Sequence, residues 1–151
     1  MIYITVIKNS ILLIDDELDI TLTIKGILED TGFKVDSFND PLLVFNNYKA
    51  NFYDLIILDI LMPKMNGFEL YVKIREKDPT IKVCFLTASE FYYEKFRKKN
   101  FFELVKLLDK EFFIQKPIKN QDLIKYVTTI INNVEDNEII ECLTKLLVYA
   151  I

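Results

Sequence analysis

Short apolar runs alternate along this chain with longer segments whose apolar residues recur every three or four positions. A continuous apolar run is typical of a strand buried on both faces, and helical recurrence is typical of an amphipathic helix. The short runs predict strands over residues 11–14, 33–38, 55–58, 81–86 and 112–114. The helical spacing predicts helices over residues 18–30, from Pro41 with Asp40 as its cap, over 67–77, and over 123–134.

This alternation of strands and helices predicts an α/β fold, a doubly wound five-stranded parallel sheet with helices on both faces. Residues 9–133 are expected to form that single domain. Residues 1–8 are expected to be an N-terminal extension or an extra edge strand, and residues 134–151 a C-terminal amphipathic helix or a linker stub. The partner of this last helix stays open between self-association, packing on the domain, and a longer chain.

The composition excludes several classes of site and partner. The 151 residues include no histidine, so this chain has no Ser-His-Asp or Cys-His nucleophile system, no imidazole ligand for zinc, and no phosphohistidine. The formal net charge of −4 argues against direct nucleic-acid binding. No stretch reaches the roughly 18 uncharged apolar residues of a membrane helix, and two cysteines suit a reducing compartment. We therefore expect a cytoplasmic protein with no membrane partner.

Polar side chains follow four of the five predicted strands at the point where each strand ends. Asp15 and Asp16 follow the first, Asp59 the third, Thr87 the fourth and Lys116 the fifth, whereas nothing obvious follows the second. Each residue alone has an ordinary interpretation, as a helix cap, a turn residue or a solvated surface cation. Functional groups of an open parallel sheet gather at the carboxyl ends of its strands, so the coincidence favours one site.

The order and local sequence of these residues resemble the receiver domain of two-component response regulators. The resemblance rests on Asp15-Asp16, on the segment DILMPKMNG from Asp59 to Gly67, on Thr87-Ala88 and on Lys116-Pro117, and it covers residues 9–133. It implies a flavodoxin-like sheet with strand order 2-1-3-4-5. It also implies a cis peptide bond between Lys116 and Pro117.

The resemblance assigns a role to each residue of the strand ends. Three clustered carboxylates repel one another by about 4 kcal/mol per pair at about 4 Å, for an effective dielectric of about 20, so they call for a cation. Oxygen ligands with room for water select Mg²⁺ or Mn²⁺. The family pattern implies that the metal is held by Asp15, Asp16, Asp59 and the backbone carbonyl of Leu61. It implies that Asp59 accepts the phosphoryl group and that Lys116 and Thr87 assist the transfer. It also implies that Thr87 and Phe113 form the switch.

The function that follows is a receiver that takes a phosphoryl group onto Asp59 from a partner phosphohistidine and then switches its protein–protein contacts. The expected partners are a histidine kinase or a histidine phosphotransfer protein, a downstream effector protein and, as a further option, a second copy of the chain. Beyond its own phosphorylation and dephosphorylation, no enzyme activity is expected. We also expect Leu61 and Ser89, which flank the approach of attacking water, to influence the lifetime of the phosphoryl group.

Three other functions are weighed against this one. The first is a receiver-like interaction module that no longer switches by phosphorylation. The second is a phosphatase of the haloacid-dehalogenase type, which would need a second acid where Leu61 stands. The third is a DNA-binding regulator, for which the residues after Asn133 leave no room for a second domain.

One region departs from the family pattern. Thr87 and Lys116 are separated by 28 residues, which is several more than the family leads us to expect. The surplus lies in the region 88–111, which combines lysine and arginine with aromatic residues. That combination fits either a partner-binding face or a solvated basic face over an aromatic core.

Overall fold

The computed structural model of the chain describes residues 9–88 and 111–132. Side chains are described for the same residues, except for residues 111–113 of the last strand. The predictions made for residues 1–8, for most of the region 88–111 and for residues 134–151 therefore lie outside the described residues.

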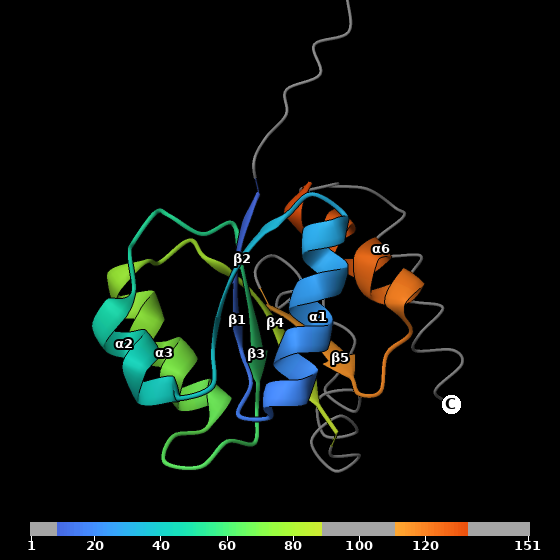
Figure 1. Ribbon diagram of the computed structural model, residues 1–151. Coiled ribbons are helices and arrows are strands. Elements are labelled where there is room, and N and C mark those ends of the chain that lie inside the picture. The colour runs from blue at the N-terminus through green and yellow to red at the C-terminus, as the bar shows by residue number, and fades with distance from the viewer. Residues whose placement is uncertain (1–8, 89–110, 133–151) are drawn as a thin grey trace, which may run out of the picture.

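Five parallel strands form one sheet, as the alternation of strands and helices predicted, and their order is β2-β1-β3-β4-β5, as the resemblance implied (Figure 1). The central strands are almost wholly buried and rich in isoleucine, leucine and valine, which is typical of a parallel sheet covered on both faces. The strands are β1 (Ser10–Ile14), β2 (Lys34–Phe38), β3 (Leu55–Asp59), β4 (Lys82–Thr87) and β5 (Glu111–Gln115).

Helices cover both faces of this sheet. On one face α1 (Leu18–Asp30) and α6 (Asn120–Ile131) pack together, and on the other α2 (Pro41–Asn47) and α3 (Gly67–Lys77) do so (Figure 1). Alternate strand residues separate into the two cores: Leu13 and Ile57 face α1 and α6, whereas Leu12 and Ile56 face α2 and α3. The period of two along each strand thus divides one sheet between two hydrophobic cores.

The ends of the helices follow from local chemistry. The carboxylate of Asp40 accepts a hydrogen bond from the backbone N–H of Leu42 at 2.9 Å, and Pro41 occupies the first turn, so the predicted cap of α2 is confirmed. Helices α1 and α3 have the predicted bounds. Helix α6 begins at Asn120, three residues before the predicted Leu123, because its first turn is polar and carries no apolar signal.

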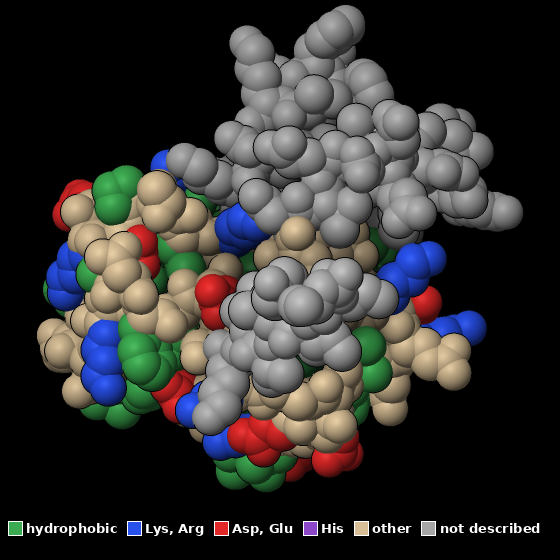
Figure 2. Space-filling view, turned by 90° about the horizontal axis from the view of Figure 1, so that it is seen from above, with side chains coloured by type: hydrophobic (Ala, Val, Ile, Leu, Met, Phe, Trp, Pro, Cys, Tyr) green, Lys and Arg blue, Asp and Glu red, His purple; other side chains and the backbone are tan. Residues whose placement is uncertain are grey.

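The described residues contain no helix that is both long enough and apolar enough to span a bilayer. The end of the molecule shown in Figure 2 carries acidic and basic side chains interspersed with one another. This end lies opposite the carboxyl ends of the strands, which meet at the lower edge of the sheet in Figure 1.

Candidate functional site

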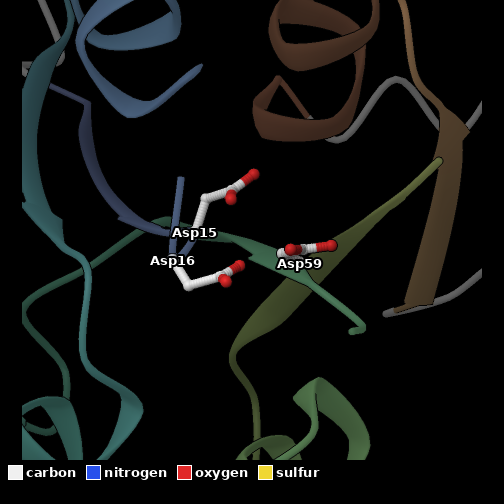
Figure 3. Close-up of side chains that lie close together, drawn as sticks. All are labelled: Asp15, Asp16 and Asp59. Carbon is white, nitrogen blue, oxygen red and sulfur yellow. The ribbon is translucent and has the colours of Figure 1, made fainter. Parts of the chain in front are cut away.

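Three carboxylates meet at the carboxyl edge of the sheet (Figure 3). Asp15 and Asp16 directly follow β1, and Asp59 is the last residue of the neighbouring strand β3. One oxygen from each of the three side chains lies within 4.8 Å of the other two. Asp15 is fully buried and Asp59 is 4% exposed, while Asp16 is the most accessible of the three. The sequence therefore predicted correctly that these acids converge.

Lys116, which follows the edge strand β5, brings a positive charge into this cluster. Its backbone N–H donates to the carbonyl of Thr87 at 2.8 Å. Its ammonium lies 2.6 Å from an oxygen of Asp15 and 3.6 Å from an oxygen of Asp59, with 10% of the side chain exposed. The peptide bond between Lys116 and Pro117 is cis, as the resemblance implied.

The burial of like charges shifts the pKa values of the cluster. Burial and the neighbouring Asp15 raise the pKa of Asp59 to about 7, whereas the Lys116 ammonium acts to lower it. Burial alone would lower the pKa of Lys116, but its hydrogen bond to Asp15 and the charges of Asp15 and Asp59 raise it above its ordinary value. One lysine thus compensates three carboxylates only in part.

The remaining residues that the sequence predicted for the site are Thr87, Leu61, Phe113 and Ser89. Thr87 ends β4, which lies between β3 and β5, and it is 1% exposed. Leu61 comes two residues after Asp59, and 50% of its surface is exposed. Phe113 lies in β5 opposite Phe85 in the strand register, but its side chain falls outside the described residues, as does Ser89.

The N-terminus of α3 packs directly on the backbone of Asp59. Asn66 caps this helix by accepting from the backbone N–H of Glu69 at 2.9 Å, and the N–H of Gly67 donates to the carbonyl of Ile60 at 2.8 Å. A Cβ atom at Gly67 would lie far inside van der Waals contact with the carbonyl oxygen of Asp59. Glycine is thus required for this close approach.

Among the described residues, two that reach the site were missed by sequence reasoning. Asn39 follows β2, the one strand that seemed to end without a functional group, and its amide donates to the carbonyl of Asp15 at 2.8 Å. Thr21, in the first turns of α1, is 1% exposed and its hydroxyl lies 3.1 Å from the same carbonyl. The sequence signal for Asn39 was its place as a polar residue at the carboxyl end of a strand.

The donor set at this edge suits a hard divalent cation. All three side chains offer carboxylate oxygens, which Mg²⁺ and Mn²⁺ prefer over nitrogen or sulfur ligands. The accessible Asp16 leaves one side of the cluster open for water, which Mg²⁺ usually retains in proteins. The residues present therefore fit such an ion.

Comparisons with known proteins agree with this geometry. A model of the response regulator receiver domain family matches residues 11–128. The chain is similar to the sensor protein EvgS of Escherichia coli K12, with 38% identity over 82 residues, which are 54% of this chain and 7% of EvgS. It is also similar to the transcriptional regulatory protein RprY of Bacteroides fragilis, with 28% identity over 84% of this chain and 51% of RprY. The chain thus spans about half of RprY and far less of EvgS.

Two solved structures extend the comparison. The first is a response regulator receiver domain protein of Clostridium thermocellum, with 28% identity, a TM-score of 0.64, and coverage of 82% of this chain and 94% of that one. The second is the response regulator TrrA of Thermotoga maritima in complex with Mg²⁺-BeF, with 27% identity, a TM-score of 0.63, and coverage of 81% and 98%.

Proposed function

The chain belongs to the response regulator receiver family of two-component signalling, and we propose that its Asp59 accepts a phosphoryl group from a phosphohistidine on a partner protein. The buried acidic cluster carries this proposal. Asp59 lies beside Asp15 and Asp16 at the sheet edge, with the Lys116 ammonium 3.6 Å from its carboxylate. A preorganised cation beside a nucleophilic carboxylate suits phosphoryl transfer, because charge develops on the phosphoryl oxygens.

In the proposed reaction, a carboxylate oxygen of Asp59 attacks the phosphorus in line. A P–O bond to Asp59 forms, the P–N bond to the partner's histidine breaks, and its electron pair returns to the imidazole. The attacking carboxylate must be ionised, and Lys116 favours this form by opposing the burial that raises the pKa of Asp59. The hydroxyl of Thr87, at the end of the neighbouring strand β4, donates a hydrogen bond to a phosphoryl oxygen of the product.

We assign the metal ligands from the same cluster. Asp16 and Asp59 would bind Mg²⁺ or Mn²⁺ directly, Asp15 would bind it partly through water, and the backbone carbonyl of Leu61 would complete the protein's share. When bound, the cation neutralises charge on the phosphoryl oxygens. The Lys116 ammonium then contacts the phosphoryl oxygens from the side of β5, since it already lies close to both Asp15 and Asp59.

Phosphorylation is proposed to act as a switch of protein contacts. It adds about −1.5 to −2 charges at the end of β3. Thr87 moves toward this charge, and Phe113 in the adjacent strand β5 is the second residue of the switch. The partners are a histidine kinase or phosphotransfer protein, a downstream effector and, as a further option, a second copy of the chain. The relatives support this class of partner, because they include a sensor protein and transcriptional regulatory proteins.

Incubation with acetyl phosphate and Mg²⁺ tests the proposal. Intact-mass spectrometry is expected to show the mass gain of one phosphoryl group in the wild type and in Asp30→Ala, a change at an exposed carboxylate of α1. The gain is expected to vanish in Asp59→Ala and in the presence of EDTA. Beryllofluoride with Mg²⁺, the group held by TrrA, serves as a second probe through chemical-shift changes in NMR spectra.

Two results would contradict the proposal. A mass gain that persists in Asp59→Ala would place the acceptor elsewhere. A wild type that shows neither a mass gain nor a response to beryllofluoride would favour a receiver-like module that no longer switches by phosphorylation.

A further inference from the structure

We propose that Asn39 and Thr21 are positioning residues for the divalent cation, because together they hold the main-chain carbonyl of Asp15 and so fix the orientation of the acidic pair. This inference rests on the proposed function, since it concerns the same metal site. We call the two side chains and the carbonyl they hold the Asp15 clamp.

The clamp consists of four short polar contacts. The amide nitrogen of Asn39 donates to the carbonyl oxygen of Asp15 at 2.8 Å and to the hydroxyl oxygen of Thr21 at 2.9 Å. That hydroxyl lies 3.1 Å from the Asp15 carbonyl and 3.0 Å from the carbonyl of Glu17. Because a hydroxyl carries one hydrogen, Thr21 divides it between these two oxygens while it accepts from Asn39.

The clamp acts on Asp16 through the peptide bond. The carbonyl of Asp15 and the backbone nitrogen of Asp16 belong to one planar unit, so fixing the first fixes the direction in which the chain enters the second. The other polar atoms of Asp15 are also held. Its N–H donates to the carbonyl of Phe38 at 3.2 Å, and its two carboxylate oxygens accept from the N–H of Glu17 at 2.9 Å and from Lys116 at 2.6 Å. The clamp therefore completes a rigid support for the residue next to Asp16.

Metal affinity is sensitive to such support. Mg²⁺ demands a nearly ideal octahedral arrangement of ligands, so a small rotation of one carboxylate weakens binding. Groups that orient metal ligands without touching the metal typically change its affinity by about 10- to 100-fold when they are removed. We expect loss of either half of the clamp to weaken Mg²⁺ binding at the lower end of this range.

The chain offers matched variants for the test. Thr21→Val removes the hydroxyl and keeps the volume of a buried side chain, and Asn39→Ala removes the amide from an exposed one. Thr23→Val is the control for the first, because the Thr23 hydroxyl bonds to the carbonyl of Asp19 on the exposed side of the same helix. Asn47→Ala is the control for the second, because its amide bonds to the carbonyl of Leu43 at the exposed end of α2.

The experiment measures the Kd of MgCl₂ by NMR titration of each full-length variant, with the melting temperature in EDTA recorded in parallel. The Kd is expected to rise about tenfold in Asn39→Ala and in Thr21→Val, and to stay at the wild-type value in both controls. The double variant is expected to lose less than the product of the two single losses, because both side chains act on one carbonyl. Thr21→Ser, which retains the hydroxyl, is expected to bind close to the wild type.

Two outcomes would overturn the inference. If Asn39→Ala and Thr21→Val bind Mg²⁺ within about twofold of the wild type, even with lowered melting temperatures, the two residues have a structural role alone. If Thr23→Val or Asn47→Ala weakens binding equally, the effect is general to the helices and not to the clamp. A wild type that fails to bind Mg²⁺ would overturn the metal-dependent function itself and the inference with it, so the two failures are distinguishable.

Discussion

At the scale of single residues, Asp59 carries a charge that its surroundings oppose. Its side chain is 6% exposed and shares its site with two other acids, while Lys116 lies closer to Asp15, at 2.6 Å, than to Asp59, at 3.6 Å. Each like-charge pair costs about 4 kcal/mol at about 4 Å for an effective dielectric of about 20. The metal-free site is therefore expected to lower the stability of the fold.

Replacing this charge makes the effect measurable. The pKa of Asp59 is raised from an ordinary value of 3.8 to about 7 in the folded protein. Because the folded state holds this proton more tightly than the unfolded chain does, Asp59 removes stability as the pH rises from 3.8 to about 7. In EDTA, we expect Asp59→Asn to be more stable than the wild type, with a larger difference at pH 8 than at pH 5.

Urea denaturation of both proteins at the two pH values checks this expectation. Asp30→Asn, at an exposed position of α1, should not reproduce the pH-dependent gain. An equal gain at pH 5 and pH 8 would contradict the assignment of the effect to ionisation of Asp59.

Leu61 provides a second prediction at this scale. This residue is 50% exposed and lies two residues after the proposed acceptor, where attacking water would approach. An apolar side chain there does not orient water, so Leu61→Asn is expected to shorten the lifetime of the phosphoryl group. The decay of the phosphorylated mass after removal of acetyl phosphate measures this lifetime, and slower decay in Leu61→Asn would refute the prediction.

At the scale of elements, helix α3 supports the site by direct contact of backbones. Its first residue, Gly67, leaves no space for a Cβ atom beside the carbonyl of Asp59, and Asn66 caps the same end. The other helical glycine, Gly26 of α1, has nothing within 4 Å of the place where a Cβ would lie. A methyl group would therefore clash with the backbone of Asp59 at Gly67 and would fit without a clash at Gly26.

The same substitution is expected to have opposite effects at these two positions. Gly67→Ala should push α3 away from β3 and destabilise the protein by about 1–3 kcal/mol, which is typical of overpacking. Gly26→Ala should stabilise it by about 0.4–1 kcal/mol, because alanine restricts the unfolded chain and favours the helix. Chemical denaturation of both variants decides the matter, and a stable Gly67→Ala would mean that the close packing relaxes without loss.

At the scale of the whole molecule, the site joins segments from separate parts of the fold. Asp15 follows β1, Asp59 ends the adjacent β3, Asn39 follows the edge strand β2, and Lys116 follows β5 at the opposite edge. A ligand bound between these loops favours the folded state, because the unfolded chain cannot assemble the same group.

Mg²⁺ is therefore expected to raise the melting temperature of the whole domain. At a free concentration of 100 times its Kd, the added stability is about 2.7 kcal/mol for one site. Thermal unfolding in a series of MgCl₂ concentrations measures this linkage, and EDTA should reverse it. Asp16→Asn should respond much less to Mg²⁺, and an equal response in this variant would indicate that the ion binds elsewhere.

Much of this molecule could be predicted from the sequence, for reasons that its residues make clear. Buried parallel strands are continuous apolar runs, and whatever follows them arrives at one edge, so Asp15, Asp59 and Lys116 could be grouped before the fold was known. The role of Asn39 could not be predicted, because its acceptor is a backbone carbonyl that leaves no mark on the sequence.

Asp78 escaped prediction for a similar reason. It is the polar residue directly after the last residue of α3, a position that is usually exposed, yet it is only 3% exposed. Its carboxylate accepts hydrogen bonds from the Tyr48 hydroxyl at 2.8 Å and from the backbone N–H of Asn51 at 3.1 Å. The contacts that tie the α2–β3 loop to α3 depend on tertiary placement, which local patterns do not contain.

The ion pair between Lys116 and Asp15 also orders events in time. Its partners lie 101 positions apart in the chain, so Asp15 leaves the ribosome long before the lysine that neutralises it has been made. A nascent chain can form β1 and β3 early, but its acidic pocket lacks this cation until β5 has joined the sheet. Under the proposed function, a nascent chain therefore carries the acceptor Asp59 before it carries the ammonium that assists phosphoryl transfer.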